Sequence, residues 1–141
     1  MADPTTAASG SPMMSVAVSA LKAQQARMRV IAENIANADS TATTPTGTPY
    51  RRQTPVFQTS KIDGANGVKL AQVVQDQTPF KLVYDPGHPA ADANGYVKQP
   101  NVDSLLESMD MREAQRAYEA NLNVIDTANA MDNSTLGILK K

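Results

Sequence analysis

The fold is set by residues 13–40, which read MMSVAVSALKAQQARMRVIAENIANADS. Large apolar residues recur there every seven positions, as in a helix that presents one face to a partner helix. They are Met14, Leu21, Met28 and Ile35, with Ile31 in a companion position. Most of the residues between them are strong helix formers, so we expect a helix of about 25 residues within 13–40. Its apolar stripe is thin, which suits packing against a second helix better than burial in a globular core.

A second helix of the same kind is expected over residues 101–133, capped by Asn101 or Asp103. Its apolar residues also recur every seven positions, and Leu122 widens the stripe. The recurring residues are Met111, Tyr118 and Ile125, with Ala114, Asn121 and Ala128 beside them. The two helices are predicted to pair as a coiled coil, with residues 134–141 as a short tail. Because one partner covers each stripe on one side only, we also expect contacts with other copies of the chain.

Residues 41–100, between the helices, are expected to form loops and a small β module. Thr, Pro and Gly dominate residues 41–49 and predict a loop. Three short strands are expected at 50–57, 68–75 and 80–84. The predicted fold class is therefore mainly α with a small β insert.

Local features refine the expected β module. Pro55 places the first strand at a sheet edge or a strand end. The alternation of the second strand slips near Val73, which indicates a bulge. Turn-forming residues fill 63–67 and 85–96, so we expect a turn in the first range and an irregular connection in the second.

The composition of the 141 residues argues against several classes of function. A net charge of −1 gives no overall field that would favour nucleic acid. The chain has no Cys and a single His, which argues against disulfides, thiolate catalysis and metal sites built from several His or Cys ligands. We therefore expect a protein that is not an enzyme and that uses no nucleic acid, small-molecule substrate or cofactor.

The first part of the chain is expected to be a tail. Residues 1–12 are a low-complexity mixture of Ala, Thr, Ser, Pro and Gly, which predicts disorder in isolation. They lack the basic and apolar regions of a cleavable secretory signal. No apolar run in the chain approaches the roughly 20 residues that a membrane-spanning helix needs. The expectation is a soluble chain that would be exported, if at all, by another route.

Three polar motifs favour a structural interpretation over a catalytic or binding one. Residues 92–95 resemble the opening of a calcium loop, but Gly95 comes at position 4 instead of 6 and position 12 is Asp103 instead of Glu, so we expect an Asx-type turn. His88 has no second His or Cys nearby, which favours turn structure or an interface hydrogen bond. Arg51 and Arg52 are too few for a nucleic-acid patch and predict an exposed strand edge or a subunit contact.

Two sets of helical residues also admit more than one interpretation. Glu107, Asp110 and Glu113 could form an acid/base pair, but a solvated face with ion pairs is the default for this spacing. Asn residues are unusual inside helices. Each of Asn34, Asn37 and Asn121 could be a buried residue that fixes register or partner choice, or a local cap or surface residue.

Several segments together resemble a family of bacterial flagellar axial proteins. Residues 31–40 resemble the N-terminal signature of flagellar rod and hook proteins, with Glu33 in place of the usual Asn. Residues 84–102 resemble, more narrowly, the C-type proximal rod proteins of the flagellar basal body, in the segments Tyr84-Asp85-Pro86-Gly87-His88-Pro89 and Pro100-Asn101-Val102. Residues 109–123 resemble the C-terminal helix of the same family.

The resemblance implies a structural subunit of the basal-body rod, the drive shaft that crosses the periplasm and transmits torque for motility. It implies self-association in a helical rod, contacts with other rod proteins and the basal-body base, and passage through the flagellar type III export apparatus without a cleaved signal. The alternative is a cytoplasmic coiled-coil adaptor or export chaperone that holds one partner with the same helices. The residues expected at the assembly interface are Met14, Leu21, Met28, Ile31, Asn34, Ile35, Asn37, Met111, Tyr118, Asn121, Leu122 and Ile125.

Overall fold

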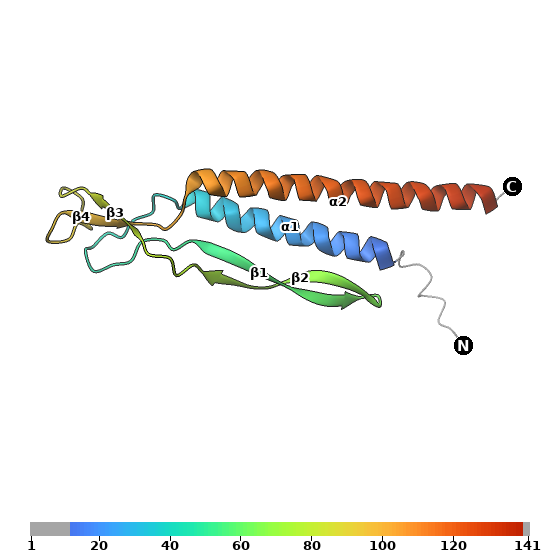
Figure 1. Cartoon of the computed structure of the whole chain (residues 1–141), viewed down its shortest axis with the longest axis horizontal. Coiled ribbons are helices and arrows are strands. Elements are labelled where there is room, and N and C mark those ends of the chain that lie inside the picture. The colour runs from blue at the N-terminus through green and yellow to red at the C-terminus, as the bar shows by residue number, and fades with distance from the viewer. Residues whose placement is uncertain (1–11, 140–141) are drawn as a thin grey trace.

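A computed structural model describes residues 12–139 as two long helices with two small β-hairpins between them in the sequence (Figure 1). The predicted tail at 1–12 lies outside the described residues, except for Pro12. The elements in chain order are α1 (Pro12–Ala36), β1 (Gln53–Ile62), β2 (Ala65–Gln75), β3 (Lys81–Tyr84), β4 (Tyr96–Gln99) and α2 (Ser104–Leu139). Neither helix is long and apolar enough to cross a lipid bilayer within these residues. At this level the predicted fold class, helices with a small β insert, is confirmed.

Helix α1 is the middle layer of the molecule. It packs against α2 on one side and against the β1–β2 hairpin on the other (Figure 1). Its buried residues are Ala17, Ser19, Ala23, Val30, Ile31 and Asn34, whereas Met14, Leu21, Met28 and Ile35 are half-buried. The expectation that α1 packs mainly against another helix was therefore incomplete, because small residues along α1 let a sheet approach it as well.

Helix α2 begins at Ser104 because Asp103 caps it. The Asp103 carboxylate accepts hydrogen bonds from the backbone N–H groups of Leu105 and Leu106, at 3.1 and 3.4 Å. The buried residues of α2 are Glu107, Ala114 and Ala128, which are separated by multiples of seven positions. The helix continues to Leu139, through residues 134–139 that were expected to be a tail.

The β1–β2 hairpin is antiparallel and closes through a two-residue turn at Asp63 and Gly64, within the predicted turn. Both residues have positive φ, 51° and 82°, which is the geometry that matches the twist of the flanking strands. The pairing shifts between Val56 and Phe57, opposite Ala71. A bulge is therefore present, two residues before the predicted position at Val73.

The β3–β4 hairpin was only half expected. β3 occupies most of its predicted range, but β4 (Tyr96–Gln99) was not predicted. Tyr96–Gln99 begins at the end of the turn-forming stretch 85–96 and carries no clear strand pattern of its own, and β4 exists because it pairs with β3. Val97 on β4 is buried beside Pro100 and Val102 in the sequence, which are buried too. All three residues lie in the segment that leads from the hairpin into α2.

Candidate assembly interface

A buried polar cluster, which we call the junction, ties the helices to the β1–β2 hairpin. It consists of Asn34, Tyr50, Arg52, Asp76, Asn101 and Glu107. Asn34 and Glu107 are each only 1% exposed. A buried polar side chain is costly unless it is hydrogen-bonded, so the partners of each group decide whether the junction stabilises the fold.

Asn34 binds the start of β1 as another strand would. Its Oδ1 accepts hydrogen bonds from the Gln53 backbone N–H at 2.9 Å and from the Tyr50 hydroxyl at 2.8 Å. Its Nδ2 donates to the Gln53 carbonyl at 2.8 Å. One amide thus holds both backbone groups of Gln53, which fixes where β1 meets α1. Burial, followed by the charges of Glu33 and Glu107, raises the pKa of Tyr50 and keeps it a donor.

Arg52 supplies the counter-charge for Glu107. Its Nε donates to the Glu107 carboxylate, and its Nη1 lies 3.2 Å from Asp76 Oδ2. The backbone N–H of Arg52 donates to Asn101 Oδ1 at 2.7 Å. Although burial opposes it, hydrogen bonding to Glu107 raises the pKa of the Arg52 guanidinium. Hydrogen bonds from the Thr78 side chain and backbone, with Arg52 adding to them, lower the pKa of Asp76.

Two sequence-based interpretations are wrong at this cluster. Glu107 was expected on a solvated face, but it is buried against Arg52. Arg52 was expected at an exposed edge or subunit contact, but it faces the inside of its own chain. The spacing of the acidic residues on α2 identifies one face of that helix. The cation beside Glu107 is Arg52, which only the folding of the segment before β1 brings there. Glu113 remains exposed, 3.6 Å from Arg27, whereas Asp110 is half-buried, with its Oδ2 4.0 Å from Arg52 Nη2.

The other polar motifs have structural roles. Arg51 stacks on Phe80, with its guanidinium carbon 4.1 Å from the ring centre. Asp92 Oδ1 accepts from the backbone N–H groups of Asn94 and Tyr96, which confirms the predicted Asx-type turn. His88 Nδ1 accepts from the Ala90 N–H at 2.9 Å, and its Nε2 lies 3.1 Å from Thr41 Oγ1, so His88 joins the 41–49 loop to the β3–β4 connection.

The residues expected at the assembly interface divide into three groups by burial. Ile31 and Asn34 are buried inside the subunit, and only Leu122 is classed as exposed, with 36% of its surface free. The others are half-buried, namely Met14, Leu21, Met28, Ile35, Asn37, Met111, Tyr118, Asn121 and Ile125. The side chains of Asn37 and Asn121 donate locally, to the carbonyls of the residues four positions earlier. The fold of one chain therefore covers much of the predicted interface.

Large exposed apolar residues, most of which were not predicted, gather at two ends of α2. Leu105, Leu106 and Met109 lie in its first two turns, and Met131, Leu136, Ile138 and Leu139 lie near its end. The presence of three large apolar residues in 134–141 was the sequence signal against reading that segment as a tail. Such concentrations of exposed apolar surface are typical of proteins that bind partners.

Comparisons with known proteins define the class to which this arrangement belongs. A family model described as flagella basal body rod protein matches residues 14–42, and one described as flagellar basal body rod FlgEFG protein C-terminal matches residues 93–138. The matched segments contain α1 from Met14 onward and most of α2.

Individual relatives cover nearly the whole chain. The flagellar basal-body rod protein FlgC of Agrobacterium fabrum is 46% identical over 140 residues, which are 98% of this chain and 97% of the relative. FlgC of Salmonella typhimurium is 50% identical over 123 residues, covering 86% and 91%. FlgC of Bacillus subtilis is 38% identical over 135 residues, covering 84% and 90%. The chain therefore belongs to the FlgC family of flagellar basal-body rod proteins, whose members are structural proteins and not enzymes.

Proposed function

We propose that this rod subunit assembles through its two terminal helices, paired as a coiled coil, into the proximal part of the axial drive shaft that transmits torque. Its partners in this proposal are further copies of itself, other rod proteins and the basal-body base. The rod would cross the periplasm, and the subunit would reach it through the flagellar export apparatus without signal cleavage. The residues at the subunit contacts are those of the predicted interface that stay accessible, Leu122 first among them.

The observation that carries the proposal is the incomplete covering of α2. Among the described elements, α2 packs on α1 alone, so one side of a 36-residue helix faces outward. A helix of this length with few large apolar residues gains most of its stability from tertiary or intersubunit packing. Neighbouring subunits would supply that packing, and burial between them would offset the cost of ordering.

Gene deletion with complementation tests the proposal. Deletion should abolish motility and leave basal bodies without a rod and hook in electron micrographs, and the wild-type gene should restore both. A gene carrying Leu122→Asp should fail to restore them, because a charge would replace an exposed apolar contact. Asn123→Asp, a charge at the exposed neighbouring position, is the matched control and should restore motility. Motile deletion cells with intact rods would contradict the proposed function.

A further inference from the structure

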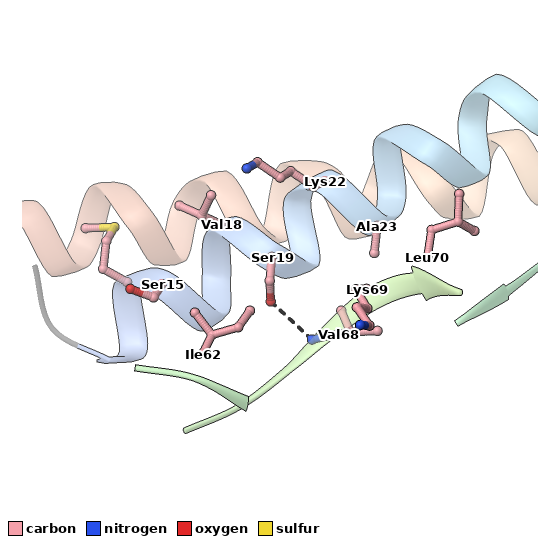
Figure 2. Close-up of a pocket in the computed structure, with 10 residues that line it drawn as sticks. Ser15, Val18, Ser19, Lys22, Ala23, Ile62, Val68, Lys69 and Leu70 are labelled. Atoms are coloured by element: carbon pink, nitrogen blue, oxygen red, sulfur yellow. Dashed lines mark hydrogen bonds between the residues drawn. The ribbon is translucent and has the colours of Figure 1, made fainter. Parts of the chain in front are cut away.

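An open groove lies between α1 and the tip of the β1–β2 hairpin (Figure 2). Its volume is about 500 Å³, and its lining is largely apolar, with Val18 and Ala23 from α1 and Ile62 and Leu70 from the strands. Two exposed lysines, Lys22 on α1 and Lys69 on β2, also line it. The groove is therefore an apolar channel with a cationic rim.

Hydrogen bonds hold the two walls of the groove in place. The Ser19 hydroxyl donates to the Val16 carbonyl and accepts from the Val68 N–H at 3.3 Å (Figure 2). At one end, the Ser15 hydroxyl donates to Asp63 in the hairpin turn at 2.6 Å. A groove with fixed walls can accept a partner without paying to order itself.

Within residues 12–139, no element packs on the end of α2, and the size of this helix end matches the groove. Met13, at the start of α1, shares a surface hollow with Ala128, which is the last buried residue of α2. Beyond that point α2 continues for about three turns, roughly 16 Å, past the start of α1 (Figure 1). We call residues 129–139 the overhang. Its apolar side chains are free: Met131 is 61% exposed, Leu136 56%, Ile138 74% and Leu139 77%.

Length and charge both fit the overhang to the groove. The α1 wall of the groove, residues 14–23, is about 15 Å long. The overhang contains one acidic residue, Asp132, and no Lys or Arg, so its charge is opposite in sign to the rim. At the turn end the groove carries Asp63, and in the sequence the overhang is followed by Lys140 and Lys141. Residues 1–11 also contain one acidic residue, but Met1 is their only large apolar residue, so they match the apolar lining less well than the overhang does.

We propose that the groove between α1 and the β1–β2 hairpin receives the overhang of a second copy of this chain, with Asp132 near Lys22. This contact rests on the proposed function and specifies one of its subunit interfaces. Asp132 of the second copy then lies toward Lys22 of the first, and the end of the second chain lies toward Asp63. In this orientation the α2 helices of the two copies point in the same direction. The groove and the overhang are different surfaces, and a contact of that kind between parallel copies repeats without closing, as a helical rod requires.

Cysteine cross-linking tests the contact, and the natural absence of Cys supplies a clean background. Cells lacking the gene would express two full-length chains together, one with Val18→Cys and the other with a cysteine at Leu136, Ile138 or Leu139 in turn. Isolated basal bodies would then be oxidised. Because a disulfide needs Cα atoms within about 7 Å, only a docked overhang joins the two chains. The matched control pairs Val18→Cys with Lys81→Cys, an exposed residue on β3.

We expect a dimer yield roughly tenfold above that of the control for at least one overhang position, because docking raises the effective concentration of the two thiols. Lys22→Glu should lower the yield by about two- to fivefold, the size of one exposed ion pair. With Lys22→Glu placed in the Val18→Cys chain, Asp132→Lys in the chain that carries the overhang cysteine should restore the yield. Recovery by the second change would show that Lys22→Glu had not simply unfolded the chain.

Other outcomes would overturn the contact. Functional rods that give no dimer above control would contradict the groove contact and leave the proposed function standing. A disulfide within one chain carrying both Val18→Cys and Ala8→Cys, without the intermolecular product, would assign the groove to residues 1–11. Failure of the wild-type gene to restore rods in the deletion strain would overturn the proposed function and this contact together.

Discussion

At the scale of single residues, the fold depends on polar groups that are buried in matched sets. Asn34 satisfies both backbone groups of Gln53 and the Tyr50 hydroxyl. Asn37, one turn later on the same helix, donates only to the Glu33 carbonyl and accepts from Ser40. The two asparagines thus differ in the hydrogen-bonding groups that their removal leaves unpaired. This difference determines how much each side chain contributes to the free energy of unfolding.

We expect Asn34→Ala to lower the free energy of unfolding by about 2–4 kcal/mol, because both backbone groups of Gln53 and the Tyr50 hydroxyl, all half-buried, lose their hydrogen bonds. Asn37→Ala should cost about 0.5–1 kcal/mol, because its partners are exposed to water. Urea denaturation of the two variants and the wild type, followed by circular dichroism, measures both values. Equal losses would mean that the junction contributes no more than a local helix-end bond.

At the scale of elements, the β1–β2 hairpin lies on α1 because its backbone can come close. A Cβ atom at Gly67 would lie 2.5 Å from Ile62 Cδ1 and 2.8 Å from Ser19 Oγ. At Gly137, within the overhang, a Cβ would meet no heavy atom within 4 Å. Replacing glycine with alanine therefore tests close packing at position 67 and helix propensity at position 137.

Gly67→Ala should destabilise the protein by about 1–3 kcal/mol, because the hairpin must move away from α1 or distort its neighbours. Gly137→Ala should be neutral or stabilise by up to about 1 kcal/mol, because alanine favours the helix. Thermal unfolding measures the difference, and hydrogen exchange of β2 amides locates it. Unchanged protection of β2 in Gly67→Ala would contradict the close approach.

At the scale of the whole molecule, the junction joins the three layers. Arg52 sits at the start of the hairpin, Glu107 on α2 and Asn34 on α1, so each layer contributes one group. Asp76, just after β2, completes the set through Arg52. Because charges participate, the coupling of the layers depends on pH.

Acid should weaken this coupling through Asp76. Its pKa is lower in the folded chain than in the unfolded one, so its contribution to stability is complete above about pH 4 and is lost as the pH falls through the lower folded-state value. Asp76→Asn should therefore be less stable than the wild type at pH 7, and the gap should narrow in strong acid. Urea denaturation from pH 7 to pH 2 measures the gap, with Asp126→Asn on exposed α2 as control. A gap independent of pH would contradict the role of the carboxylate.

Local sequence patterns are enough to predict the two helices, the turn at 63–67, parts of three strands and the family, because each depends on neighbours along the chain. The first strand was predicted at 50–57, and β1 instead runs from Gln53 to Ile62. The signals for these features are local: apolar residues that recur every seven positions, helix-forming composition and turn-forming residues. The predicted end of the second helix, at residue 133, is too early, because α2 runs on to Leu139.

Local signals do not specify which distant segments come into contact, and these contacts are seen only in the folded chain. The tertiary structure set α1 between α2 and a sheet, paired Arg52 with Glu107 across 55 residues of chain, and made a strand of Tyr96–Gln99. It also placed the overhang beyond the start of α1, where its apolar residues find no cover in the described chain. The physical reason is the same in each case, because a charge or an apolar side chain acquires its energy from whatever folding brings beside it, and spacing along the chain does not specify that neighbour.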